Sequence, residues 1–433
     1  MTISVLHVCA AALCALAPTL PIQSPQDPSC TREELARDAD ALGLGIWFGY
    51  SLARLGDVDV DGVADFAVGS PLASGFEYTP GRVAAISAAS GKVLWVEAGE
   101  QGFGECVASL GDLDGDGLED LGVTAWSNRV VLLSGADGRR IRAHDVQADD
   151  GRDRSACVAG LEDVDGDGVG DVLIGRPRSG GLWVHSSADG AELLHVAPEA
   201  GTWAGAVVLG LGDVNGDGDG AGDFAFTRCG HAPLEHEDFE IARSPTAVAV
   251  ASGKTGEVLY TFEPARSSTP DELRLAAIGD VDLDGVADFA VAATNARPDG
   301  DPRVPGCVEL HSGRNGGLLG SAGDEHTNRS FGYALDASVE GELLVSQFAK
   351  GDEDLLHGFL FAYELAPLEP SWHQEAPNPF GHSVLCLDDV DGDGRADYAV
   401  GVTFDDAGAF EQGYVQVRSG ATHRVLYRVP PPG

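Results

Sequence analysis

Short apolar segments alternate with turns rich in glycine and aspartate along most of the chain. One pattern recurs: an apolar stretch, Gly-Asp or a variant of it, acids at alternate positions, a glycine, another aspartate and a second apolar stretch. Its first copy reads LGDVDVDGVADFAVGSP. Short apolar runs bounded by Gly and Asp are typical of β-strands joined by turns. The six copies begin at Leu55, Leu110, Leu161, Leu211, Ile278 and Leu387.

The spacing of these copies predicts a seventh unit. The first acids of the loops are Asp57, Asp112, Asp163, Asp213, Asp280 and Asp389, at steps of 55, 51, 50, 67 and 109 residues. Because the last step is about twice a single repeat, we expect one more unit inside it. The segment FGYAL at Phe331–Leu335 matches FGYSL at Phe48–Leu52, and Glu340 then falls where the first Asp belongs.

The second half of each unit adds two apolar segments around a Ser/Gly turn, as in RVAAISAASGKVLWV from Arg82. Glycine at such a turn supplies the positive φ that hairpins need, and in the seventh unit His423 takes its place. Four short antiparallel strands per unit are the content of a propeller blade. We therefore predict an all-β fold, a seven-bladed β-propeller of four-stranded blades over residues 44–429. The other turn glycines are Gly91, Gly138, Gly190, Gly256 and Gly316.

Three short segments lie outside the repeats. Residues 1–23 contain an apolar run rich in small residues and are predicted to be an export signal, whose cleavage site stays open. Residues 24–43 form a short N-terminal segment in which Thr31 and Glu34 fit a helix capping box. Residues 430–433 are a tail. These features predict a secreted, periplasmic or cell-surface protein with no membrane span in the mature chain.

Several units also carry Phe-Gly ahead of the first apolar segment, and Gly69-Ser70-Pro71 is close to Gly-Ala-Pro. With these residues the units resemble FG-GAP repeats, and the chain resembles the N-terminal β-propeller of integrin α-chains from about Gly43 to Val429. The resemblance implies calcium-binding loops, and a ligand surface on the face opposite them. The Phe-Gly pairs are Phe48-Gly49, Phe103-Gly104, Phe331-Gly332 and Phe380-Gly381.

The acidic loops have the residues that calcium requires. Ca²⁺ takes several hard oxygen ligands in a flexible geometry. Acids at positions 1, 3 and 5 of a curved loop direct carboxylates inward, Gly at position 6 lets the backbone turn, position 7 offers its carbonyl and position 9 completes the shell. An EF-hand is excluded because position 12 holds an apolar residue such as Val68 instead of Glu. The predicted ligands of the five regular loops are Asp57, Asp59, Asp61, Val63 and Asp65; Asp112, Asp114, Asp116, Leu118 and Asp120; Asp163, Asp165, Asp167, Val169 and Asp171; Asp280, Asp282, Asp284, Val286 and Asp288; and Asp389, Asp391, Asp393, Arg395 and Asp397.

Two units depart from this pattern. The fourth loop has Asp213, Asn215 and Asp217, but its closing acid, Asp223, comes two residues late, with Asp219 as an alternative. We expect that site to be weaker or differently shaped. The sixth unit reads EGELLV and is expected to lack a site. About six Ca²⁺ ions are therefore predicted, with a mainly structural role, and whether they also regulate stays open.

The formal net charge is −42. Such a chain will not bind nucleic acid or an anionic membrane through its overall field. The six loops alone contribute 23 carboxylates. Because these repel one another without metal, we expect the stability of the fold to depend on calcium.

The sequence favours a binding module over an enzyme. It contains no HExxH and no GxSxG motif, so we name no catalytic residue and no organic cofactor. The variable loops at residues 70–81, 228–246, 295–306 and 404–412 are predicted to share the face opposite the calcium loops. We expect a monomer that binds an extracellular protein or glycan there. The alternative is a carbohydrate-active lyase or hydrolase, which a cluster of buried acids or histidines on that face would favour.

After removal of the signal, six cysteines remain, which permits disulfides in an exported chain. Cys229 and Cys307 occupy corresponding loops of neighbouring units and are a candidate bridge. Cys106 and Cys157 each stand six residues before the first Asp of their loops. For this pair, shared packing and bonding both stay open, and the overall pairing is not decided by the sequence.

Overall fold

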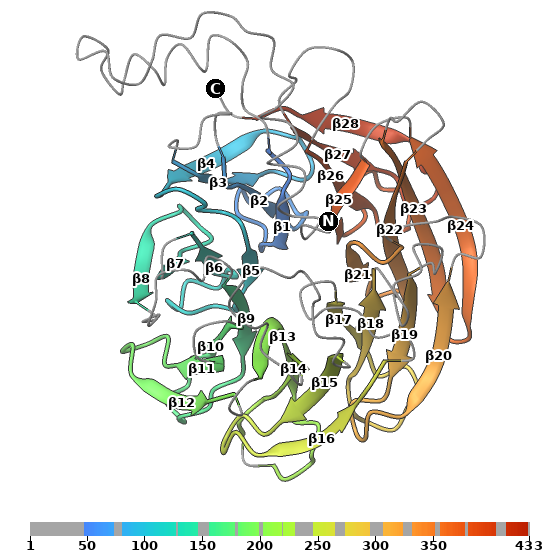
Figure 1. Ribbon diagram of the computed structural model, residues 1–433. Coiled ribbons are helices and arrows are strands. Elements are labelled where there is room, and N and C mark those ends of the chain that lie inside the picture. The colour runs from blue at the N-terminus through green and yellow to red at the C-terminus, as the bar shows by residue number, and fades with distance from the viewer. Residues whose placement is uncertain are drawn as a thin grey trace, which may run out of the picture.

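Seven four-stranded antiparallel sheets surround a central axis as the blades of a propeller (Figure 1). This computed structural model confirms the predicted all-β fold and the number of blades. The described residues are 47–72, 80–126, 129–145, 156–177, 181–198, 202–218, 220–229, 246–264, 273–294, 306–323, 331–350, 356–376, 380–403 and 413–431. The predicted signal, the N-terminal segment and most of the variable loops lie outside them.

Each blade takes its four strands consecutively from the chain. Blades 1 to 4 contain β1 (Ser51–Arg54), β2 (Phe66–Ser70), β3 (Arg82–Ile86) and β4 (Val93–Ala98); β5 (Val107–Ser109), β6 (Leu121–Thr124), β7 (Arg129–Leu133) and β8 (Arg140–Asp145); β9 (Cys157–Leu161), β10 (Asp171–Arg176), β11 (Gly181–His185) and β12 (Glu192–Val196); and β13 (Trp203–Gly212), β14 (Asp223–Cys229), β15 (Thr246–Ala251) and β16 (Val258–Phe262). Blades 5 to 7 contain β17 (Leu273–Gly279), β18 (Asp288–Ala293), β19 (Cys307–His311) and β20 (Leu318–Gly323); β21 (Leu335–Ala337), β22 (Glu342–Lys350), β23 (Leu356–Leu365) and β24 (Leu368–Ala376); and β25 (Phe380–Cys386), β26 (Tyr398–Val402), β27 (Tyr414–Arg418) and β28 (Val425–Val429).

The first strand of each blade lies nearest the axis and the fourth lies at the rim (Figure 1). Each first strand contacts the first strand of the next blade, and β25 contacts β1, so the inner strands form a closed ring. Every residue of β2 is buried, whereas the rim strand β20 contains only exposed and half-buried residues. The middle strands are apolar on both faces because a neighbouring blade covers each side.

The hydrophobic core therefore lies between blades. One cluster joins Ala67 and Val83 of blade 1 to Leu121 and Val131 of blade 2. The last and first blades share a cluster of the same kind, in which Val415 and Val417 pack with Phe48 and others. No described strand is exchanged at this closure, so side-chain packing and a few hydrogen bonds hold the ends of the ring together.

Glycines allow the inner strands of adjacent blades to approach closely. A Cβ placed on Gly69 of β2 would lie 2.2 Å from the carbonyl oxygen of Gly104, in the Phe-Gly turn of blade 2. The equivalent Cβ on Gly401 would lie 2.0 Å from the carbonyl oxygen of Gly49, where the ring closes. Gly49 itself has a φ of 89°, which disfavours any residue with a side chain. The two glycines of the FG-GAP pattern thus meet across a blade boundary.

The turns between third and fourth strands match the sequence prediction. In the six blades with an acidic loop, the amide of the turn residue donates to the carbonyl of a serine, as Gly91 N does to Ser87 O at 2.8 Å, whereas in blade 6 only residues 366–367 separate β23 from β24. All five predicted turn glycines have positive φ, and His423 has a φ of 58° in blade 7. Every blade has a register shift between these two strands, although only six of the seven share this turn.

Candidate calcium loops

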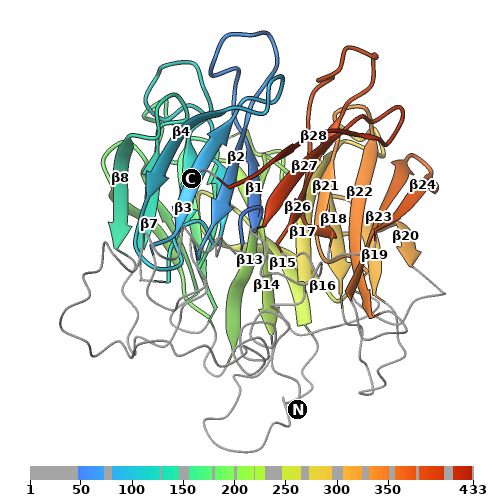
Figure 2. The ribbon, with the colours of Figure 1, turned by 90° about the horizontal axis from the view of Figure 1, so that it is seen from above.

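The acidic loops join the first strand to the second in six blades. Because the strands are antiparallel, these loops share one face of the propeller with the turns between third and fourth strands, along the upper edge of Figure 2. The beginnings of the first strands lie on the opposite face. This is the division of the two faces that the repeat pattern predicts.

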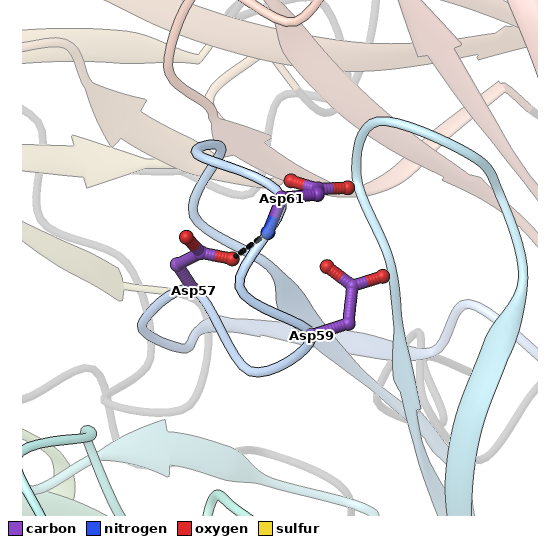
Figure 3. Close-up of side chains that lie close together, drawn as sticks. All are labelled: Asp57, Asp59 and Asp61. Carbon is purple, nitrogen blue, oxygen red and sulfur yellow. Dashed lines mark hydrogen bonds between the residues drawn. The ribbon is translucent and has the colours of Figure 1, made fainter.

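The first acid of each loop organises the loop backbone. In blade 1, the Asp57 carboxylate accepts hydrogen bonds from the backbone amides of Asp61 at 2.9 Å and Gly62 at 2.8 Å. The Asp61 carboxylate in turn accepts from the amide of Val63 at 3.0 Å. Figure 3 shows the side chains of Asp57, Asp59 and Asp61 gathered by this curvature. The same contacts recur around Asp112, Asp163, Asp280 and Asp389.

Five loops bring three carboxylates together, with one oxygen of each within 4.8 Å of the others. In blade 1 the three come from positions 1, 3 and 5. In blades 2, 3, 5 and 7 they come from positions 1, 3 and 9. In all five loops the position-5 carboxylate accepts a hydrogen bond from the amide of position 7. The predicted role of the position-7 carbonyls stays a prediction. The convergent sets are Asp57, Asp59 and Asp61; Asp112, Asp114 and Asp120; Asp163, Asp165 and Asp171; Asp280, Asp282 and Asp288; and Asp389, Asp391 and Asp397.

The closing acid is the buried member of each loop. Asp120 has no exposed surface, and its carboxylate accepts from the amides of Leu113 at 2.7 Å and Gly135 at 2.9 Å. Gly135 belongs to the turn between the third and fourth strands, so Asp120 ties two loops of its blade together. Burial raises the pKa of Asp120 to about 6, although these hydrogen bonds act to lower it. Without a cation, the charge at this position is unfavourable.

All six closing acids make this connection, which the sequence analysis did not predict. Each is at most 1% exposed, and burial raises the pKa of every one of them. A signal for it was present, since a serine precedes the donor residue in each turn. The acid and donor pairs are Asp65 and Ala88, Asp120 and Gly135, Asp171 and Ser187, Asp223 and Gly253, Asp288 and Gly313, and Asp397 and Gly420.

The fourth loop keeps this connection despite its extra length. The Asp223 carboxylate accepts from the amides of Val214 and Asn215, both at 3.1 Å, and from Gly253 at 3.2 Å. Asp213 bonds the amides of Gly216 and Gly218, as the first acid does elsewhere. The two additional residues are accommodated in the glycine-rich part of the loop, so the closing acid keeps its place. Asp219 lies outside the described residues.

In blade 6 a tight turn replaces the loop. Residues 338–341 connect β21 to β22, and the Ser338 amide donates to the carbonyl of Glu342 at 2.8 Å. The Glu340 carboxylate lies 3.7 Å from the guanidinium of Arg395, in the blade 7 loop. Glu340 therefore makes an ion pair at the surface instead of beginning an acidic loop.

The side chains present fit a hard divalent cation. Carboxylate oxygens are the ligands that Ca²⁺ prefers. In blade 2, Asp114 Oδ1 is buried and has no hydrogen-bond partner, although Arg139 lies 2.7 Å from the other oxygen. A buried, unpartnered carboxylate oxygen close to two further acids is the atom that a bound cation would satisfy.

Comparison with known proteins agrees with the resemblance. No protein-family model matches the chain. Integrin alpha pat-2 of Caenorhabditis briggsae is 37% identical over 100 residues, which are 20% of this chain and 8% of that protein. Over this stretch the propeller resembles an integrin α-chain. Since the match spans less than a tenth of the relative's length, it supports the type of repeat and not the activity of the whole protein.

Solved structures support the fold alone. Saccharomyces cerevisiae Sqt1 superposes with a TM-score of 0.51 at 10% identity, covering 89% of this chain and 86% of that one. At such low identity the likeness shows a shared propeller architecture and no function. Among the described residues, no helix is long and apolar enough to cross a membrane.

On the opposite face, the propeller has polar side chains where the inner strands begin. Tyr50, Tyr333 and His382 follow the Phe-Gly pairs of blades 1, 6 and 7. His382 Nε2 lies 3.2 Å from the Tyr333 hydroxyl, and its Nδ1 lies 3.1 Å from the Tyr50 carbonyl. Arg274 of blade 5 lies over the Tyr333 ring, 5.7 Å from its centroid. Burial lowers the pKa of His382 to about 4, so it is neutral at physiological pH.

A buried acid occupies the same position in blade 2. Glu105 follows Phe103-Gly104, and burial raises the pKa of its carboxyl to about 8. One of its oxygens, Oε2, is buried without a hydrogen-bond partner, while the Trp126 side chain hydrogen-bonds to the carboxyl. The face opposite the calcium loops thus contains a protonatable acid and a neutral histidine on inner strands.

Proposed function

We propose that this chain is an extracellular recognition module in which Ca²⁺ stabilises the propeller and the opposite face binds a protein or a glycan. The observation that carries the proposal is the convergence of three carboxylates in each of five acidic loops. The similarity to an integrin α-chain supports placement outside the cell or on its surface. We propose a monomer, because the blades complete a closed ring within one chain.

The proposed role of calcium is structural. The loops stand between strands of a single blade, and their closing acids bond the second turn of that blade. A bound Ca²⁺ would supply the positive charge that these buried carboxylates otherwise lack. Asp223 makes these contacts in the fourth loop as well, so we include that loop, with Asn215 as an amide ligand, and arrive at six sites. Blade 6 is omitted.

The proposed ligand surface is the face on which the inner strands begin. The second strands end and the third strands begin on the same face. Such a surface, supported by a rigid ring, can change its loops without disturbing the blades. Tyr50, Tyr333 and Trp126 lie at the described part of this face. Aromatic side chains of this kind serve as anchors for protein or sugar ligands.

Thermal unfolding of the purified chain with calcium, with excess chelator and with equimolar magnesium tests the structural claim. We expect a large fall in Tm on chelation that calcium reverses and magnesium does not, because Mg²⁺ demands a tighter octahedral site. An unchanged Tm would refute the calcium sites. Terbium luminescence titrated with calcium would then count the sites, and about six are expected.

The alternative function, a carbohydrate-active lyase or hydrolase, has its own supporting observation. Glu105 and His382 are a buried acid and a neutral base, and perturbed groups of this kind collect at catalytic sites. A reducing-end assay against a panel of acidic and neutral polysaccharides separates the two functions. Turnover that is lost in Glu105→Gln and His382→Gln would establish an enzyme. Retention on a glycan or protein array without turnover would establish the binding module.

A further inference from the structure

Two cysteine side chains meet across the boundary between blades 2 and 3. Cys106 immediately precedes β5 and Cys157 begins β9, the inner strands of adjacent blades. The two strands contact each other, and the two thiols hydrogen-bond to one another. Both residues are half-buried, and both thiols are free in the structure. This contact joins residues that are far apart in sequence and belong to separate sheets.

The position itself is built to reach the next blade. Ser51 and Ser383 also stand six residues before the first Asp of their loops. The Ser51 hydroxyl donates to the carbonyl of Gly104 in the next blade at 2.9 Å, and the Ser383 hydroxyl donates to that of Gly49 at 2.7 Å. A side chain at this position therefore spans the blade boundary. In blades 2 and 3 the residues at this position are both cysteine, and the contact across the boundary is between two thiols.

We propose that Cys106 and Cys157 form an inter-blade disulfide when the folded chain meets a thiol–disulfide oxidant, such as oxidised glutathione or a disulfide oxidoreductase. In the first step the Cys157 thiolate attacks one sulfur of the oxidant, which releases one thiol and leaves a mixed disulfide. In the second step the Cys106 thiolate attacks the Cys157 sulfur and releases the second thiol. The oxidant gains two electrons and two protons, and the propeller gains one S–S bond.

The surroundings of the two thiols give this order of attack. The hydrogen bond from Cys106 and the positive charge of Arg274 lower the pKa of Cys157, despite its burial. The hydrogen bond to Cys157 and burial raise the pKa of Cys106. Since the thiolate is the nucleophile, Cys157 is the first to react. Cys106 is then positioned as the resolving thiol.

Thiol mapping of the full folded chain tests the proposal. The chain is first reduced, the reductant is removed, and calcium and oxidised glutathione are added under native conditions. Iodoacetamide then blocks the remaining thiols before digestion and mass spectrometry. We expect a peptide pair joined through Cys106 and Cys157, with a mass two hydrogens below the sum of its parts, and neither residue alkylated. Reduction before alkylation should restore both thiols.

Single substitutions supply the controls. Cys106→Ser and Cys157→Ser are expected to fold, because serine occupies the same position in blades 1 and 7. Cys106→Ser should accumulate a stable glutathione adduct on Cys157, which identifies the first nucleophile. Cys386→Ser, which removes a buried thiol of β25, should leave the Cys106–Cys157 link intact. Oxidation should raise the Tm of the wild type and of Cys386→Ser, but not that of the other two variants.

Two results would overturn the proposal. One is full alkylation of both Cys106 and Cys157 after native oxidation. The other is a link from either residue to a different cysteine. The wild-type map decides both without any variant. The Cys229 side chain lies outside the described residues, so the Cys229–Cys307 bridge stays a prediction that the same map will test.

Discussion

Replacing the closing acid of one loop tests whether it ligates calcium or only bonds the backbone. Asp120→Asn keeps the size of the side chain and removes its charge. The Asp120 carboxylate accepts from the amides of Leu113 and Gly135 on different oxygens. Asparagine has one acceptor oxygen, so one of these buried amides loses its partner. That loss costs about 2 kcal/mol in any buffer.

The effect of the charge depends on the metal. In the metal-free protein, burial raises the pKa of Asp120 to about 6, so ionisation at pH 7 costs about 3 kcal/mol relative to the unfolded chain. Removing the charge recovers this energy and offsets the lost hydrogen bond. In calcium, the carboxylate is paired with the ion, and removing one partner of a buried charge pair costs about 4 kcal/mol. We expect Asp120→Asn to be nearly neutral in chelator and strongly destabilising in calcium.

Urea unfolding at pH 7, followed by circular dichroism in saturating calcium and in chelator, measures both costs. If the chelated wild type is already unfolded, the calcium concentration at half-folding gives the same comparison. Asp137→Asn is the matched control, because Asp137 is an exposed acid in the turn of the same blade, and it should change stability by less than about 0.5 kcal/mol in either buffer. An equal loss of stability for Asp120→Asn in both buffers would show that the Asp120 carboxylate only accepts backbone hydrogen bonds and does not bind calcium.

Three further predictions concern strain, close packing and pH. Val60 has a φ of 60° and is 85% exposed, so Val60→Gly should raise the free energy of unfolding by about 0.5–1 kcal/mol in urea titrations. Gly115 is the corresponding residue of blade 2, and no atom lies within 4 Å of a Cβ added there. Gly115→Val should therefore lower the free energy of unfolding by about 1–2 kcal/mol through backbone strain alone. A loss of stability in Val60→Gly would mean that the valine makes a favourable contact that its exposure conceals. Gly401→Ala would place a Cβ 2.0 Å from the Gly49 carbonyl oxygen and should lower the free energy of unfolding by more than about 3 kcal/mol, because it separates blades 7 and 1. A lower Tm and faster proteolysis would show this loss. Wild-type stability would mean that the two blades move apart without cost. Burial lowers the pKa of His382 to about 4 in the native chain. Below pH 6.5 this histidine is therefore protonated in the unfolded chain but stays neutral in the native chain. The free energy of unfolding should fall by up to about 3 kcal/mol as the pH falls from 6.5 to 4. In saturating calcium between pH 7 and 5, this fall should be smaller in His382→Gln, and parallel curves would contradict the lowered pKa.

The number of blades and the faces of the propeller followed from the sequence because each is encoded locally. The acids at alternate positions set the loop between the first and second strands. The turn glycines require positive φ, and the structure has it at Gly91 and at the irregular His423. Even the eroded unit was recognisable, since its Phe-Gly segment precedes β21 and Glu340 falls in a turn between strands as expected. Local features of this kind survive when one repeat changes.

Contacts between distant parts of the chain could not be read in the same way. The hydrogen bond from the Gly135 amide to Asp120 depends on how the blade twists, and the serine before the donor does not by itself identify the acid that accepts. The fourth loop illustrates the limit. The late arrival of Asp223 predicted a weaker or differently shaped site, which stays a prediction, but its carboxylate still accepts from the amides of Val214 and Gly253. Spacing along a glycine-rich loop does not fix the position of its end.

The repeat motif contains residues that make contacts between blades as well as residues that make contacts within one blade. The Phe-Gly glycine of one unit faces the second-strand glycine of the unit before it, as Gly104 faces Gly69 and Gly49 faces Gly401. The residue two positions after the Phe-Gly glycine reaches across the boundary on the other side, to the following unit, whether it is Ser51 or Cys106. The acidic loop instead fastens strands within one blade. Calcium loss and a broken boundary should therefore unfold the ring differently: chelation should loosen every blade that has a loop, whereas a substitution at one boundary should open the ring at that point.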